Sequence, residues 1–297
     1  MNMKLSNRAQ ATNSNQTGAV GAGASDHTRA AQRNYRRHGT RGHDLSNRAE
    51  VLDLIRRSPQ VDNLRDTNSD DHRCGAAAIT NALLLDGNHA ANAQAVRQFA
   101  GPDLSTRDNR ALQAFESGEA VTPRHAARIQ NIIYRSSTQN SELGVGRRGN
   151  RDNRDGMGPF DLTDTVARLR AAQPDALSNT RDVRFVGQSG HWTMTHTDRE
   201  GRSVHANSWP NASGQATVTP GRGVVRGAVV NGRANPETQN DVYIAPQEGR
   251  TYYQIHESLP GTDGVSRLVE LRQSVPRGGQ IPNDRQDFRQ QPGFFRP

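Results

Sequence analysis

The chain of 297 residues is long enough for one large domain or two small ones. Only 32% of its residues are hydrophobic and 5% are aromatic, and the mean hydropathy is −0.88, so we expect part of the chain to remain unfolded. No stretch has the roughly 18 consecutive apolar residues of a membrane span, and the N-terminus lacks the apolar core of a secretory signal peptide.

The formal net charge of +8 would suggest a nucleic-acid-binding protein if it were spread over the folded part. Residues 1–45 hold seven Lys or Arg against two Asp, and residues 273–297 hold four Arg against two Asp, which leaves the stretch between them at +1. The excess therefore lies in the two ends. We expect them to make at most weak contacts with nucleic acid or an anionic membrane surface.

Composition divides the chain into a central domain and two tails. Residues 1–45 are rich in Asn, Gln, Ser, Thr and Gly, lack apolar periodicity and are predicted to be a disordered basic tail. This acid-poor start resembles the export signals of bacterial type III secretion effectors, which would place the protein in a host cytoplasm. A tail of any cytoplasmic protein can have the same composition. Residues 46–272 are expected to form the domain, and residues 273–297 a loose C-terminal tail.

Helical patterns fill the first part of the domain. Ser46 is predicted to cap a helix that ends before Pro59. Further helices are expected from Cys74 to Asp86, from Ala90 to Ala100, from Thr106 to Ser117, from Pro123 through Ile133 and from Leu162 to Ala172. A loop rich in Gly, Arg and Asn at 136–159 interrupts this series, and its length suggests that it borders a substrate cleft.

Beyond Asp182 the patterns favour strands. They are predicted at Val183–Val186, His191–Thr197, Ser203–Ser208, Val224–Val230, Asp241–Ala245 and Thr251–His256, separated by Gly, Asn and Pro turns. Helices followed by an antiparallel sheet make an α+β fold.

The only cysteine, Cys74, stands where a polar run gives way to an Ala- and Leu-rich helical pattern. In the first turn of a helix, backbone N–H groups and the positive helix end favour a thiolate, which is a nucleophile. A lone buried cysteine is otherwise a small core residue, so its chemistry depends on a proton carrier elsewhere in the chain.

A histidine and an asparagine elsewhere in the chain are the candidate proton carrier and its orienting residue. Gly190-His191-Trp192 opens one predicted strand, and Asn207-Ser208-Trp209 ends the next. Antiparallel pairing would bring the His191 and Asn207 side chains together on one face. Asn207 would then orient the imidazole, which serves as base to the thiol and as acid to the leaving amine.

These three patches, Cys-Gly at a helix start, Gly-His-Trp at a strand start and Asn-Ser-Trp on the following strand, resemble the papain-like cysteine proteases. The resemblance implies a papain-like fold, with the nucleophile helix packed on a C-terminal antiparallel sheet and with Cys74, His191 and Asn207 as the catalytic residues. It also implies a protein or peptide substrate and no cofactor. The Cys-Gly context is closer to the bacteriocin-processing and effector branches than to papain, which has an aromatic residue after its cysteine.

The family also places a Gln a few residues before the cysteine as an oxyanion-hole donor. Asn68 occupies the matching position here, with a side chain one methylene shorter. Ser69 and Gln188 are the alternatives.

Other functions remain open at this stage. The same residues serve peptide hydrolysis, deamidation and transglutamination, and a non-catalytic binding module with basic tails would use Cys74 for packing only. The histidines show no metal-ligand spacing, no CxxC or HExxH motif is present, and a single cysteine excludes an internal disulfide.

Overall fold

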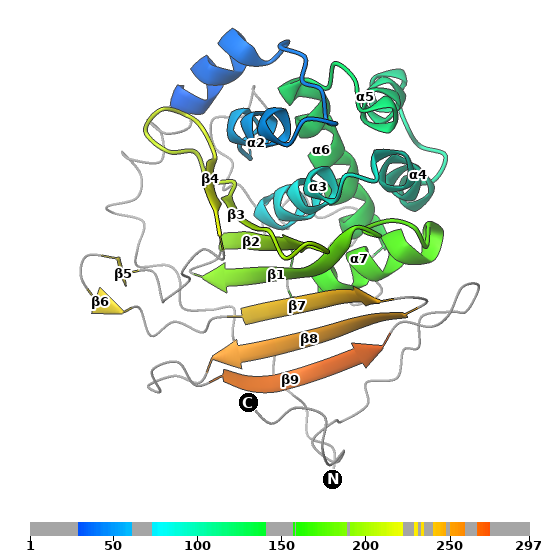
Figure 1. The fold of residues 1–297 in the computed structure, drawn as a ribbon, viewed down its shortest axis with the longest axis vertical. Helices are drawn as coiled ribbons and strands as arrows, with labels where there is room; N and C mark the ends of the chain where they lie inside the picture. The colour runs from blue at the N-terminus through cyan, green and yellow to red at the C-terminus, as the bar shows by residue number, and fades with distance from the viewer. Residues whose placement is uncertain are drawn as a thin grey trace.

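The chain folds as a layer of helices packed on an antiparallel sheet, so the expected α+β class is confirmed (Figure 1). The computed structural model describes residues 29–60, 73–140, 157, 159–188, 191–221, 229–230, 233–234, 240–247, 250–258 and 266–273. The predictions made for Asn68, Ser69, most of the 136–159 loop, residues 224–228 and almost all of the C-terminal tail lie outside these described residues.

The helices are α2 (Arg48–Arg57), α3 (Cys74–Asp86), α4 (His89–Ala100), α5 (Thr106–Ser117), α6 (Pro123–Asn140) and α7 (Pro159–Ala172). Local signals set their ends. Asn47, rather than Ser46, caps α2, because its side chain accepts the N–H of Ala49. Gly87 and Gly118 end α3 and α5 with positive φ angles of 82° and 72°, which cost glycine little. Helix α6 runs on to Asn140 and α7 begins at Pro159, so both ends of the predicted 136–159 loop are helical.

The strands are β1 (Thr180–Gln188), β2 (His191–Asp198), β3 (Ser203–Asn207), β4 (Thr217–Pro220), β5 (Val229–Val230), β6 (Arg233–Ala234), β7 (Asn240–Gln247), β8 (Arg250–Ser258) and β9 (Ser266–Gln273). Seven of them form one sheet in the order β4-β3-β2-β1-β7-β8-β9, antiparallel at every step, while β5 pairs with β6. Strands β4, β6 and β9 were not predicted from the sequence. Figure 1 shows the helices α2 to α6 gathered beside β1–β4, with β7–β9 extending away from them.

Helix α3 is the centre of the core. Every residue from Cys74 to Asp86 is buried, because α3 packs against α2, α4, α6 and α7 and also against β1, β2 and β3. Its sequence is apolar on all sides, as is typical of a helix that is surrounded by other elements. The expected packing of the cysteine-bearing helix on the antiparallel sheet is therefore present.

Strand alternation builds the sheet side of this core. On β2, Trp192 and Met194 are buried in the same hydrophobic cluster as α3. Met194 pairs with Phe185 of β1 and with Ala206 of β3, which are also buried in that cluster. One face of β1–β3 therefore supports α3, and the residues that alternate with these positions have the other orientation.

Residues 29–45 depart from the sequence-based expectation of a disordered tail. Residues 29–38 form a helix, and His43 pairs with Val121 as an isolated antiparallel bridge. Ala31 and Tyr35 are buried. Composition alone suggested disorder because the apolar residues in this stretch are small and few, yet one side of the helix finds a partner surface on the domain.

Candidate active site

Cys74 is the first residue of α3, and it is buried and outside any disulfide. Arg73, the N-cap residue, makes no side-chain cap hydrogen bond, and the first turn of the helix contains no acidic residue. The guanidinium of Arg73 instead donates to Asn131 Oδ1 and lies over the Tyr134 ring, 5.6 Å from its centroid. The positive helix end favours negative charge at the position of the thiol.

His191 and Asn207 are joined directly by a hydrogen bond. His191 Nε2 lies 2.7 Å from Asn207 Oδ1, and the backbone N–H of Trp209 donates to the same oxygen at 2.9 Å. A backbone N–H can only donate, so it identifies the Asn207 atom at this point as the oxygen. The oxygen in turn requires a donor from the ring, which places a proton on Nε2 of His191.

The other ring nitrogen of His191 carries the lone pair of the neutral imidazole. Nδ1 is buried and has no hydrogen-bond partner anywhere in the described part of the chain, Cys74 included. Burial lowers the pKa of His191, and the hydrogen bond to Asn207 offsets part of that effect. The ring is therefore held neutral, with a basic nitrogen available to a proton donor. Catalytic hydrogen bonds are often long or absent before substrate binds.

Trp209 covers the His191 and Asn207 pair from one side. Its indole meets the imidazole edge-on, with ring centroids 5.3 Å apart and planes at 77°. It is also 40% exposed, and no other large hydrophobic residue in the described part of the chain is exposed. An apolar surface thus lies in contact with both the imidazole and solvent.

Met157 links the start of α3 to the start of β2. Its backbone oxygen accepts the indole N–H of Trp192 at 2.6 Å. A Cβ on Gly75 would lie only 2.9 Å from the Met157 Cβ, so glycine is needed for this approach. The residues that follow Cys74 and His191 in the chain therefore contact the same methionine.

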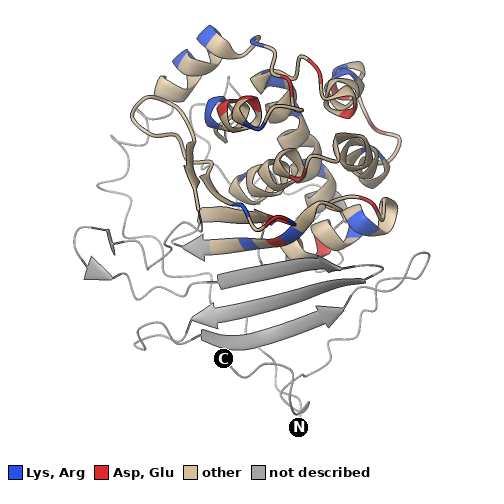
Figure 2. Cartoon of the chain, viewed as in Figure 1, with Lys and Arg blue, Asp and Glu red and all other residues tan. Residues whose placement is uncertain are grey.

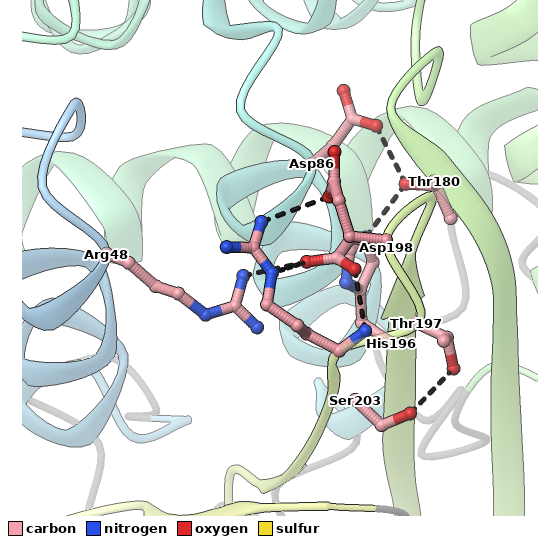
Figure 3. A network of polar contacts seen from close by, with 9 residues as sticks. Arg48, Asp86, Thr180, His196, Thr197, Asp198 and Ser203 are labelled. Atoms are coloured by element: carbon pink, nitrogen blue, oxygen red, sulfur yellow. Dashed lines mark hydrogen bonds and ion pairs between the residues drawn. The ribbon is translucent and has the colours of Figure 1, made fainter.

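The far ends of α3 and β2 are joined as well (Figure 3). Thr180 donates its hydroxyl to Asp86 at 2.7 Å and lies 2.8 Å from Nε2 of His196. From Cys74 to Asp86 a helix rises about 18 Å, and from His191 to His196 a strand rises about 17 Å. The two elements therefore run side by side in the same direction, and their first residues, Cys74 and His191, lie at the same end.

This second polar cluster was not anticipated from the sequence, which gave His196 no role. Asp86 also accepts the Asn179 backbone N–H at 2.9 Å and the Asn92 amide at 3.0 Å. Burial raises the pKa of Asp86 and lowers that of His196 to about 4, so His196 is neutral near pH 7. Beside it, Asp198 pairs with Arg48 and with Arg202. We interpret the cluster as the structural anchor of α3 on the sheet.

The structure also identifies a glutamine that the sequence analysis missed. Gln60 and Ser208 are both buried, and the Ser208 hydroxyl donates to Gln60 Oε1 at 2.7 Å. The Gln60 backbone N–H donates to the backbone carbonyl oxygen of Ser208 at 2.9 Å. Gln60 is thereby fixed beside Asn207, while the predicted donor Asn68 lies outside the described residues. The side chain of the alternative Gln188 is likewise not described. Gln60 was missed because it is 14 positions ahead of Cys74 in the sequence, not six.

The described residues contain no group of three or more His, Cys, Asp and Glu side chains arranged to hold a metal ion. Within the same ranges, no helix is long and apolar enough to cross a membrane. No family model, curated protein or solved structure matches this chain.

Proposed function

We propose that this chain is a cysteine amide hydrolase of the papain-like type, with Cys74 as nucleophile, His191 as general base and acid, and Asn207 as the residue that orients the imidazole. The observation that carries the proposal is the hydrogen bond from His191 Nε2 to an Asn207 oxygen that also accepts a backbone N–H. That arrangement leaves the buried, unpaired Nδ1 of His191 as the base. Cys74 and His191 lie at the same end of α3 and β2, which supports Cys74 as the proton donor to Nδ1.

The proposed reaction follows from these positions. Nδ1 of His191 takes the thiol proton, and the sulfur of Cys74 bonds to the substrate carbonyl carbon as the C=O electron pair moves to oxygen. The tetrahedral species collapses, the C–N bond breaks, and the leaving amine takes the proton from Nδ1. Water then gives a proton to Nδ1 and attacks the thioester, which releases the acid and the Cys74 thiolate.

Gln60 is the oxyanion donor that the contacts favour. The Ser208 hydroxyl donates to its side-chain oxygen and so fixes the orientation of the amide. Its attachment beside Asn207 keeps it at the same end of β3 as the imidazole pair. Gln60→Ala should therefore lower kcat by roughly 10²-fold, the effect of losing one preorganised donor.

Peptide hydrolysis is the leading reaction. Deamidation also uses water as the acyl acceptor but attacks a side-chain carboxamide, and transglutamination passes the acyl group of that carboxamide to an amine. A fluorescent casein assay detects peptide hydrolysis, ammonia release from glutamine peptides detects the other two reactions, and incorporation of a labelled amine into those peptides separates transglutamination from deamidation. We also propose that the polar N-terminal residues act as an export signal that directs the protein into a host cell. Secretion of a reporter fused to residues 1–28 would test this.

The deciding experiment compares Cys74→Ala and His191→Ala with His205→Ala. His205 is a matched control, because it also lies on this sheet and its Nδ1 is 3.1 Å from the hydroxyl of Thr195, while no hydrogen bond joins it to Asn207 in the described part of the chain. We expect Cys74→Ala to abolish turnover and His191→Ala to lower it by roughly 10²- to 10⁴-fold. His205→Ala should leave it near the wild-type rate. Equal losses for both histidine variants would count against a specific role for His191.

Rapid, pH-dependent alkylation of Cys74 that His191→Ala slows would support an enzyme even before a substrate is known. Slow alkylation in folded wild-type protein, unchanged by His191→Ala, would instead indicate a binding module in which Cys74 only packs.

A further inference from the structure

Residues 29–38, here called the arginine helix, form an amphipathic helix at the edge of the domain. Arg33, Arg36 and Arg37 are exposed along one side, while Ala31 and Tyr35 are buried on the other. The helix contains no Asp or Glu, and Figure 2 shows basic but no acidic positions along it.

None of these three arginines forms a salt bridge with any described residue, whereas many other arginines of the domain do. Asp53, for example, is shared by Arg41, Arg57 and His43. The positive charge of Arg33, Arg36 and Arg37 is therefore not neutralised by salt bridges within the described structure. Unpaired, exposed charge of one sign attracts ligands of the opposite sign over about 10 Å at moderate salt.

The arginine helix packs on the loop that leads away from the candidate site. A Cβ at Gly214 would lie 2.1 Å from the backbone carbonyl of Ala30, so the two backbones are in direct contact. The loop between β3 and β4 also contains Trp209, which touches His191. Gly214 lies five positions after Trp209, a span of at most about 18 Å.

The basic surface continues past the end of the arginine helix. The Arg124 N–H donates to the Gly39 oxygen, and a Cβ at Gly39 would lie 3.3 Å from Arg124 Nε. Arg124 is exposed at the start of α6. The charge thus forms a strip that begins beside the Trp209 loop and extends away from it.

We propose that the arginine helix is a docking surface for an acidic segment of the polypeptide substrate, which it holds beside the candidate active site. This inference rests on the proposed function. An extended peptide covers about 3.3 Å per residue, so a segment of roughly ten residues would span both the arginine strip and Trp209.

A polypeptide fits this surface better than a nucleic acid does. Sites for single-stranded nucleic acid combine positive charge with exposed aromatic side chains on which bases stack. The aromatic residue of the arginine helix, Tyr35, is only 8% exposed, which leaves Trp209 beside the candidate site as the single exposed large aromatic of the described residues. The proposed chemistry of the neighbouring site also acts on an amide.

The test uses full-length protein carrying Cys74→Ala and a fluorescein-labelled, glutamate-rich peptide, with binding measured by fluorescence anisotropy at low salt. The double substitution R33Q/R36Q removes two exposed charges from the arginine helix. Its matched control is R107Q/R110Q, which removes two exposed arginines with the same spacing from α5. We expect the first pair to weaken peptide binding roughly three- to tenfold and the control pair to change it less than twofold.

Equal weakening by both pairs would overturn the proposal, since only overall charge would then matter. Undetectable peptide binding would also overturn it. So would binding of an oligo-dT probe of the same net charge that is weakened by R33Q/R36Q when binding of the peptide is not.

A second measurement separates this inference from the proposed function. With Cys74 intact, a peptide that joins the glutamate-rich segment to a neutral arm should slow alkylation of Cys74, and R33Q/R36Q should remove that protection. Peptide binding without protection would overturn the substrate assignment. Alkylation that is indifferent to His191→Ala would overturn the proposed function, whatever the anisotropy result.

Discussion

The bond between His191 and Asn207 gives the sharpest prediction. Asn207→Ala removes an oxygen that accepts two hydrogen bonds, at 2.7 Å from Nε2 of His191 and at 2.9 Å from the Trp209 N–H. Each is worth about 0.5 to 1.5 kcal/mol between neutral groups, so we expect the free energy of unfolding to fall by about 1 to 3 kcal/mol.

The effect on chemistry is a separate quantity. When His191 takes the thiol proton, its bond to Asn207 becomes a bond from a charged donor, worth about 1.5 to 3 kcal/mol. Asn207 thus favours the imidazolium over the neutral ring by about 1 to 1.5 kcal/mol, or roughly tenfold. Losing it lowers the pKa of His191 further, because burial is then opposed by no hydrogen bond from Asn207.

The assay is the rate of Cys74 alkylation by iodoacetamide, followed through the pH range in which imidazole titrates. We expect Asn207→Ala to slow the reaction near neutral pH by roughly tenfold, because fewer thiols have passed their proton to His191. Urea unfolding of the same variant measures the loss of stability independently.

Asn211→Ala is the control for this experiment. Asn211 lies in the same loop, and its Oδ1 also accepts two backbone N–H groups, from Ser213 and Gln215 at 2.9 and 3.1 Å. The Asn211→Ala variant should have a lower free energy of unfolding, but its Cys74 should be alkylated at the wild-type rate. Equal alkylation rates in wild type and Asn207→Ala would refute the assignment of Asn207 as the orienting residue, and equal slowing by both variants would attribute the effect to the loop.

Three further predictions concern the framework that holds the site. Asp86→Asn should lower the free energy of unfolding by about 2 to 4 kcal/mol in urea titrations, because the carboxylate accepts from four donors and an amide accepts from fewer. Trp192→Phe leaves the Met157 oxygen without its indole donor and should cost about 1 to 3 kcal/mol by the same measurement, and an unchanged midpoint would argue against this link between α3 and β2. The folded-state pKa of His196, about 4, lies below its ordinary value of 6.5, so the unfolded chain binds the proton more readily. The wild-type protein should therefore lose about 3 kcal/mol as pH falls from 6.5 through 4, and His196→Gln should lose less over the same window.

Local pattern anticipated most of the elements. The Ala- and Leu-rich run after Cys74 and the glycine at position 87 predicted α3 with its observed bounds. Alternating residues predicted β1, β2 and β3 within a few positions. Short-range signals of this kind act within one helical turn or one strand, so they can be read from neighbouring residues. The helix at residues 29–38 was not predicted by them, because it packs on residues far away along the chain, such as Gly214.

The residues of the candidate site were also chosen from the sequence, but only as types in an order. Cys74, His191 and Asn207 were named because a thiol, an imidazole and an amide in that succession fit one chemistry. What the sequence determined by itself is this set of groups and the elements that carry them.

Their arrangement was decided by tertiary contacts. The direction of the Asn207 amide depends on the Trp209 backbone, the parallel course of α3 and β2 depends on Met157 and Thr180, and the fixing of Gln60 depends on Ser208, 148 positions away. Such contacts join groups that no local pattern relates, because hydrogen bonds between distant residues form only after packing has fixed both backbones.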